Sequence, residues 1–178
     1  MKTSDAAALI RTPLIEWTRP QTWCDLGCGD GTFTVALAQL LQSGSAIHAV
    51  DIDLRGLESI PDQQNGVQVR KVLADLQSPG LRLPLVDGIL MANSLHFIRD
   101  QRQLLRKLLS ITNRFLIVEY ERSRSSRWVP YPIDFKKLGE LFSEIGVERV
   151  ERIATRPSRF GGAMYSAFAE NRAALLMC

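Results

Sequence analysis

The sequence predicts an α/β fold built on a mostly parallel sheet, and two patterns in the chain support this prediction. First, apolar runs typical of buried strands alternate with segments of helical periodicity. Second, the last two strand candidates have only a loop between them, so one of them must run antiparallel to its neighbour. The predicted sheet therefore ends in a C-terminal antiparallel hairpin. In chain order the strand candidates lie near 22–26, 46–51, 67–74, 86–93, 115–120, 147–153 and 163–169.

The helix candidates between these strands have recognisable ends. Side chains that accept a hydrogen bond from the first turn are favoured immediately before a helix, and glycine is favoured immediately after one. The expected caps are Thr32, Asp53 and Asp100, and Gly146 is expected to end a helix that runs from about 134 to 145.

Length and composition predict one domain. The hydrophobic content of 46% is enough for a single core, and a chain of 178 residues is too short for two ordinary domains. We expect one domain over 1–178, with a helical N-terminal segment over 1–20 and a short tail over 171–178 to which the sequence assigns no role. No apolar run approaches the ~20 residues of a membrane span and no signal peptide is recognisable, so a cytoplasmic protein is expected.

The three cysteines do not predict a disulfide framework or a metal site. Cys24 and Cys28 are four residues apart across the end of a strand, and no second Cys/His pair lies near them. We expect them to be small buried residues. The net charge of +3 is mild and does not by itself imply a nucleic-acid partner.

The stretch from Asp25 to Thr32 is the strongest functional signal. A buried strand leads into glycines at alternate positions, 27, 29 and 31, and a helix follows. This arrangement holds nucleotide-like ligands against a helix N-terminus, because glycine permits a tight turn and close approach. A dinucleotide fingerprint would need glycine at Thr32. Asp25 and Asp30 would repel a pyrophosphate and suit a ligand with an ammonium group and net positive charge.

On these residues the chain resembles the class I S-adenosylmethionine-dependent methyltransferases, whose first motif has the pattern of Asp25 to Gly31. The resemblance covers nearly the whole chain after Thr22. It implies a Rossmann-like three-layer sandwich with a seven-stranded sheet, and S-adenosylmethionine as the cofactor. A nicotinamide site and a Rossmann-like turn without a ligand are the alternatives for the glycine loop.

Further cofactor contacts are expected where the next strands end. Asp51 follows the glycine loop by about twenty residues, where an acid can accept hydrogen bonds from ribose hydroxyls. By the resemblance, Asp75 accepts a hydrogen bond from the adenine amino group and the backbone of Leu76 faces the ring, although Asp75 also suits a turn. The predicted cofactor-binding residues are Asp25, Gly27, Cys28, Gly29, Asp51, Ile52, Asp75, Leu76 and Asn93.

The segment after the fourth strand supplies the candidate catalytic residue. Ser94-Leu95-His96-Phe97 resembles the family's fourth motif, which lies beside the reacting centre. It is not the motif of amino-nitrogen methyltransferases, because Ser94 and Leu95 stand at its proline positions. His96 could take a proton near neutral pH, and an orienting or structural histidine is the alternative.

The acceptor is the least determined part of the prediction. The stretch 121–132 carries three arginines together with Trp128 and Tyr131, and we expect its part from 122 to 132 to border the acceptor pocket. These residues could hold an acidic small molecule or a phosphate backbone, or they could form a solvated loop. The sequence therefore predicts a methyltransferase acting on a small-molecule acceptor, with a nucleic-acid acceptor open but unsupported. A non-catalytic S-adenosylmethionine-binding regulatory or partner subunit is the alternative.

Overall fold

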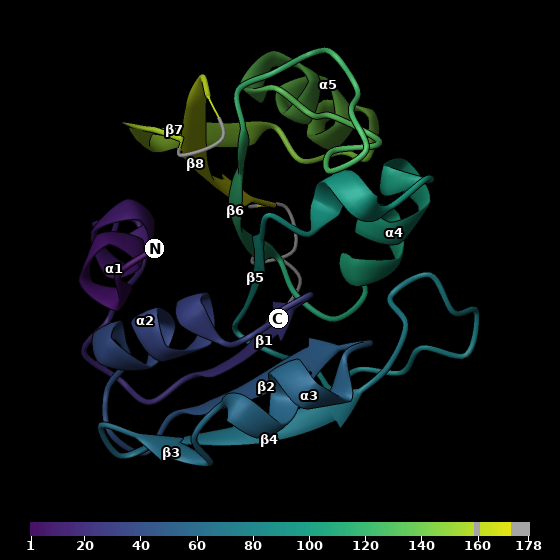
Figure 1. Ribbon diagram of the computed structural model, residues 1–178. Helices are drawn as coiled ribbons and strands as arrows, with labels where there is room; N and C mark the ends of the chain where they lie inside the picture. The colour runs from purple at the N-terminus through teal and green to yellow at the C-terminus, as the bar shows by residue number, and fades with distance from the viewer. Residues whose placement is uncertain (159–160, 172–178) are drawn as a thin grey trace.

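The computed structural model of the chain describes residues 1–158 and 161–171 and contains one mixed sheet (Figure 1). Its eight strands lie in the order β3-β4-β2-β1-β5-β6-β8-β7. The five strands from β4 to β6 are mutually parallel, β8 runs antiparallel to β6, and β7 runs antiparallel to β8. The bounds are β1 (Thr22–Leu26), β2 (Ala46–Asp51), β3 (Gln63–Gln64), β4 (Val67–Leu73), β5 (Gly88–Ala92), β6 (Arg114–Tyr120), β7 (Arg149–Pro157) and β8 (Ala163–Glu170).

The predicted α/β fold class with its C-terminal antiparallel hairpin is confirmed. The sheet has one strand more than the predicted seven, because the two residues of β3 pair antiparallel with the start of β4. Two residues are too few to show a period in sequence, so no apolar pattern marks this strand. The predicted tail lies, apart from Asn171, outside the described residues.

Helices cover both faces of the sheet and give three layers (Figure 1). The strand face that carries Trp23 and Leu90 packs against α1 and α2, and α3 packs against Ala49 on the same face. The opposite face packs against α4 and α5. The bounds are α1 (Thr3–Ile10), α2 (Thr32–Leu40), α3 (Leu54–Ser59), α4 (Gln101–Leu108) and α5 (Phe135–Glu144), with a 3₁₀ turn η1 (Leu95–Phe97).

Two of the predicted helix caps are confirmed and one is wrong. The side chains of Asp53 and Asp100 accept hydrogen bonds from backbone N–H groups in the first turns of α3 and α4. Thr32 is not the cap of α2 but its first residue, because Gly31 adopts a left-handed conformation (φ 81°) and takes the cap position. Asp30 Oδ1 then accepts hydrogen bonds from the backbone N and the hydroxyl of Thr32.

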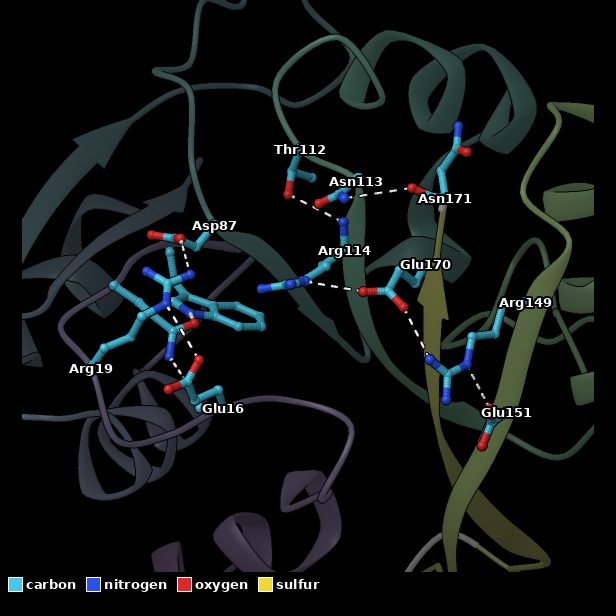
Figure 2. Close-up of polar contacts among 12 residues, drawn as sticks. Glu16, Arg19, Asp87, Thr112, Asn113, Arg114, Arg149, Glu151, Glu170 and Asn171 are labelled. Atoms are coloured by element: carbon cyan, nitrogen blue, oxygen red, sulfur yellow. Dashed lines mark hydrogen bonds and ion pairs between the residues drawn. The ribbon is translucent and has the colours of Figure 1, made fainter. Parts of the chain in front are cut away.

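Ion pairs tie the strands together at the edge of the sheet where the parallel strands begin (Figure 2). Asp87, just before β5, accepts hydrogen bonds from the Arg19 guanidinium at 2.9 Å and from the backbone N of Thr22 at 2.8 Å. Glu170, at the end of β8, pairs with Arg114 of β6 at 3.2 Å and with Arg149 of β7 at 3.0 Å. Neighbouring strands are thereby joined by side chains as well as by the backbone.

Candidate functional site

A cavity of about 630 Å³ opens where the parallel strands end, and all nine predicted cofactor-binding residues line it. Its walls come from the ends of β1, β2, β5 and β6, from the segments that follow β1, β2, β4 and β5, and from α1, α2, β7 and β8. In sheets of this kind ligands bind beyond the carboxyl ends of the strands, and the volume suits a small-molecule site.

The glycine loop shapes the cavity through two glycines with different surroundings. Gly27 (φ +73°) and Gly29 (φ +55°) both adopt left-handed conformations that disfavour larger residues. A Cβ on Gly27 would lie 2.4 Å from the Cβ of Ser94, so only glycine lets the loop pack against the segment after β5. A Cβ on Gly29 would meet nothing within 4 Å. Gly29 therefore leaves open space beside the loop.

Asp25 is fully buried at the end of β1 and is only half satisfied. Its Oδ2 accepts a hydrogen bond from Thr34 Oγ1 at 2.6 Å, and its Oδ1 has no partner among the described residues. Burial raises the pKa of Asp25 to about 7, the Thr34 hydrogen bond opposes this rise, and the negative charge of Asp51 adds to it.

Asn93 presents a second buried oxygen without a partner. It follows β5, the neighbour of β1, and it has a left-handed backbone (φ 55°) that is uncommon outside glycine. Its Oδ1 accepts no hydrogen bond from any described residue. Buried polar atoms normally have partners, because an unsatisfied one costs about 1–3 kcal/mol. Two such acceptor oxygens in the lining of one cavity indicate a ligand that donates hydrogen bonds.

Asp51 holds the glycine loop in place. Its Oδ2 accepts a hydrogen bond from the backbone N of Gly29 and its Oδ1 accepts one from the backbone N of Asp53, both at 2.8 Å. Each carboxylate oxygen can accept more than one hydrogen bond, so capacity for a diol remains. Asp75 also has a local partner, because its Oδ1 accepts from the backbone N of Gln77 at 2.8 Å. Both acids nevertheless line the cavity.

His96 is buried behind the cavity and paired with Glu119. Its Nδ1 lies 2.7 Å from Glu119 Oε2 and its backbone N donates to Oε1 of the same carboxylate. The two side chains are only 2% and 1% exposed. The imidazole ring contacts Phe97 and Tyr120, with centroids 4.3 and 5.6 Å away, and both of these aromatic residues line the cavity. His96 itself is not among the described lining residues.

The segment 121–132 does not border this cavity, contrary to the prediction. None of the described residues that line the cavity belongs to it, and Trp128 is 77% exposed. The segment folds over η1 on the α4–α5 face, since the backbone N of Tyr131 donates to the carbonyl of His96 and Val129 is buried. A second hollow of about 320 Å³ lies there, lined by Arg99, Gln101, Ser123, Ser125, Pro130, Tyr131, Pro132, Asp134 and Lys137.

Several lining residues were not predicted. Asp5 comes from α1, Arg156 from β7 and Met164 from β8, and Phe97 completes the wall next to His96. β7 extends to Pro157, beyond the predicted end near Ile153, and this extension carries Arg156 to the cavity. No local pattern signals that α1 docks beside the hairpin, because that contact depends on the assembled sheet.

Residues 1–158 and 161–171 lack two other features. No group of three or more His, Cys, Asp or Glu side chains in these ranges could hold a metal ion. Within the same ranges, no helix is both long enough and apolar enough to cross a membrane.

Comparison with known sequences and structures points to methyltransferases. Residues 24–114 match the sequence profile of a family described as a methyltransferase domain. No curated protein sequence shows significant similarity to the chain. A solved structure of a SAM-dependent methyltransferase from Aquifex aeolicus is similar over 96% of this chain and 99% of that one, with 14% identity and a TM-score of 0.64.

Two further solved structures are similar in fold. One is the N-terminal domain of EvdMO1 with SAH bound, matched over 97% of this chain and 82% of that one, with 16% identity and a TM-score of 0.66. The other is the mitomycin 7-O-methyltransferase MmcR, matched over 94% of this chain and 53% of that one, with 13% identity and a TM-score of 0.66. At these identities the similarity establishes a shared fold.

Proposed function

Because the chain belongs to this methyltransferase-domain family, we propose that it transfers the methyl group of S-adenosylmethionine to a small-molecule acceptor. Membership of the family implies S-adenosylmethionine as the cofactor. When bound, the cofactor supplies a methyl group that its sulfonium already activates. The protein then has to bind both reactants and align them, and alignment alone can supply about 7–11 kcal/mol in favourable cases. We propose that residues 1–178 belong to one methyltransferase-like domain.

The observation that carries this proposal is the pair of unsatisfied oxygens, Asp25 Oδ1 and Asn93 Oδ1, in the lining of one cavity. The methionine part of the cofactor carries an ammonium group with three N–H donors. Two buried acceptor oxygens can accept two of these three hydrogen bonds, and the carboxylate form of Asp25 complements the positive charge. A pyrophosphate has no donors to offer these oxygens, so a nicotinamide cofactor fits less well.

The other predicted residues fit the adenosine part of the same cofactor. We propose that Asp51 accepts hydrogen bonds from the ribose hydroxyls while it keeps its bonds to Gly29 and Asp53. Asp75 Oδ1 is used within its turn, which leaves Oδ2 for the adenine amino group. Ile52 and Leu76 would supply the apolar contacts to the ring. Gly27, Cys28 and Gly29 bring the backbone close to the ligand.

For His96 we propose the role of a general base towards an acceptor that reacts as a protonated nucleophile. The pairing of Nδ1 with Glu119 favours the tautomer in which Nε2 carries a free lone pair, and Nε2 has no hydrogen-bond partner among the described residues. Replacing His96 by Gln should then lower the rate about 10²–10⁴-fold and remove the ascending limb of the pH–rate profile. A loss below tenfold with the limb intact would leave His96 as the residue that positions Phe97 and Tyr120.

A small-molecule acceptor is supported by the cavity volume and by the fold. About 630 Å³ is in the range of small-molecule sites. A protein named as a mitomycin 7-O-methyltransferase shares the fold.

Titration calorimetry with S-adenosylhomocysteine and with NADH tests the proposed cofactor. We expect S-adenosylhomocysteine to bind and NADH not to bind, and the reverse order would refute the proposal. A screen of acceptors with radiolabelled S-adenosylmethionine then tests transfer. Cofactor binding with no methylated product would favour a non-catalytic subunit.

A further inference from the structure

The residues that line the cavity fall into two groups according to the strands that carry them. The predicted cofactor residues lie at or just after the ends of β1, β2, β4 and β5. The remaining strand residues of the lining include Tyr120 on β6, Met164 on β8 and Arg156 on β7, which lie on the other side of β5 in the sheet. If the proposed function holds, this second part of the cavity is the space for the acceptor.

Tyr120, Met164 and Arg156 form one continuous strip. Tyr120 is paired directly with Met164 across β6 and β8, and Met164 is paired directly with Arg156 across β8 and β7. Side chains of directly opposite residues point to the same face of the sheet, and their Cβ atoms lie about 4.5–5.5 Å apart. Met164 and Tyr120 belong to the apolar layer under α1 and α2. The strip thus runs from an aromatic ring, over a thioether, to a guanidinium group.

Asp5 of α1 neutralises the charged end of this strip. Its Oδ2 lies 3.3 Å from Nη1 of Arg156 and accepts a hydrogen bond from Nη2 at the same distance. α1 is fixed above the strip, because Ala6 and Ile10 are buried and Ser166 Oγ donates to the carbonyl of Leu9 at 2.5 Å. Asp5 and Arg156 both line the cavity and are 43% and 35% exposed. A ligand at this end of the strip would therefore meet an ion pair in which Asp5 cancels the charge of Arg156.

The rest of the described lining is acidic. Besides Asp5 it contains four aspartates, and Arg156 is the one lysine or arginine among the described lining residues. An anionic ligand would therefore meet unfavourable charge unless Arg156 were free to bind it. At the other end of the strip, the hydroxyl of Tyr120 has no hydrogen-bond partner among the described residues. Burial and the charge of Glu119 raise the pKa of Tyr120, so its hydroxyl stays a donor at neutral pH.

We propose that the acceptor is a ring-bearing small molecule without net negative charge, and that Asp5 determines this specificity by neutralising Arg156. The inference rests on the proposed function, because it assigns the acceptor to the part of the cavity that the cofactor leaves open. The ring would lie against Tyr120 and Phe97, which are the aromatic residues of the lining next to His96.

Three phenols of nearly equal size and different charge test the proposal. They are tyramine, which is cationic at neutral pH, 4-ethylphenol, which is neutral, and 4-hydroxyphenylacetate, which is anionic. Binding to the protein saturated with S-adenosylhomocysteine is measured by ligand-observed NMR. We expect the neutral and cationic phenols to bind at least about tenfold more tightly than the anionic one, which corresponds to about 1.4 kcal/mol.

Variants at Asp5 make the test specific. Asp5→Asn keeps the size of the side chain and leaves the charge of Arg156 uncompensated, so affinity for 4-hydroxyphenylacetate should rise about tenfold while that for 4-ethylphenol changes less than about twofold. Asp5→Glu keeps the negative charge, so the three phenols should bind with the same order of affinities as in the wild type. Asp62→Asn is the matched control, because Asp62 pairs with Lys71 and is not among the described lining residues.

Aromatic variants test the placement of the ring. Tyr120→Ala should weaken binding of all three phenols, and Trp128→Ala should weaken none, since Trp128 is exposed and not among the described lining residues. The inference is overturned if the wild type prefers the anionic phenol, if Asp5→Asn leaves the order unchanged, or if no phenol binds at millimolar concentration. Failure to bind S-adenosylhomocysteine would overturn the proposed function and this inference with it.

Discussion

The two edges of the parallel sheet carry similar polar side chains, which differ in whether all their oxygens have partners. At the edge where the strands begin, Asp87 and Glu170 are each bound by arginine (Figure 2). At the edge where the strands end, Asp25 is fully buried and has one oxygen without a partner, and Asn93 beside it has another. Asp87 and Glu170 are thus satisfied where they join strands, whereas Asp25 and Asn93 each keep one oxygen for which a ligand is the expected partner.

The comparison is sharper between two buried acids on the same edge. Asp25 ends with one hydrogen bond, from Thr34, whereas both oxygens of Glu119 are bonded to His96. Burial is nearly equal, since Asp25 is 0% and Glu119 is 1% exposed. Burial is therefore nearly the same for both acids, and the difference between them is the oxygen of Asp25 that has no partner among the described residues.

Removing the charge of Asp25 should have the largest effect and should stabilise the unliganded protein above pH 7. The pKa of Asp25 is raised in the folded state to about 7, so the folded state binds more protons than the unfolded state between about pH 4 and 7. Stability therefore falls as pH rises through this window, by about 4 kcal/mol at most.

The Asp25→Asn variant should lack this component of the pH dependence. It should be more stable than the wild type at pH 8 and no more stable at pH 5, while it binds S-adenosylmethionine more weakly. Urea unfolding at both pH values measures the difference between the two proteins. Parallel curves for wild type and variant across this range would contradict the assignment of a buried, unpaired carboxyl group.

At the edge where the parallel strands begin, removing a carboxylate should destabilise the protein instead of stabilising it. Glu170→Ala leaves two arginines without their shared partner and should lower the free energy of unfolding by about 2–3 kcal/mol. Cofactor affinity should not change, because Glu170 is not among the described residues of the cavity. The control is Glu151→Ala, which removes an exposed partner of Arg149 and should cost less than about 1 kcal/mol. Equal losses in the two variants would show that burial of the Glu170 pairs does not matter.

Asp51→Ala should weaken cofactor binding by about 1–3 kcal/mol, because ribose hydroxyls would lose their acceptor and Gly29 would lose its partner. Asp53→Ala is the matched control two residues away. It removes the cap of α3 and should cost about 1 kcal/mol of stability without a comparable loss of affinity. Calorimetry with S-adenosylhomocysteine measures both, and unchanged affinity in Asp51→Ala would remove Asp51 from the site.

The sequence predicts the cavity lining near β1, β2 and β5 far better than the lining near β6, β7 and β8. Asp25, Asp51 and Asn93 lie at or next to the ends of strands that a run of apolar residues marks. Parallel strands bring such ends to one edge whatever the details of packing. The lining near β6, β7 and β8 depends on strand register and on the docking of α1. Which residue faces Met164 across the sheet is fixed by the pairing of β6, β8 and β7, and this pairing leaves no local signal at Arg156.

The wrong placement of the segment 121–132 has the same origin. It follows β6 at the edge of the sheet that carries the site, so adjacency in sequence favoured it as a neighbour of the acceptor. In the structure Glu121 accepts a hydrogen bond from the backbone N of Phe135 and pairs with Arg152, which holds the segment on the α4–α5 face. Sequence order places a segment at an edge, and tertiary contacts decide on which face it continues.

The smallest effect is expected at Asp75, because one oxygen of this side chain has a structural partner and the other is proposed to bind the cofactor. Its Oδ1 is satisfied by the backbone N of Gln77, as at a structural position, and its Oδ2 is the atom proposed for adenine. Asp75→Asn keeps an acceptor for Gln77 and replaces the other oxygen with an N–H donor, which faces the amino group of adenine unfavourably. Affinity for S-adenosylhomocysteine should fall by about 1 kcal/mol, roughly fivefold, with the free energy of unfolding unchanged. Asp75→Ala should lower both, because the turn loses its hydrogen bond as well. If Asp75→Asn binds as well as the wild type while Asp75→Ala is destabilised, Asp75 serves the turn and not the cofactor.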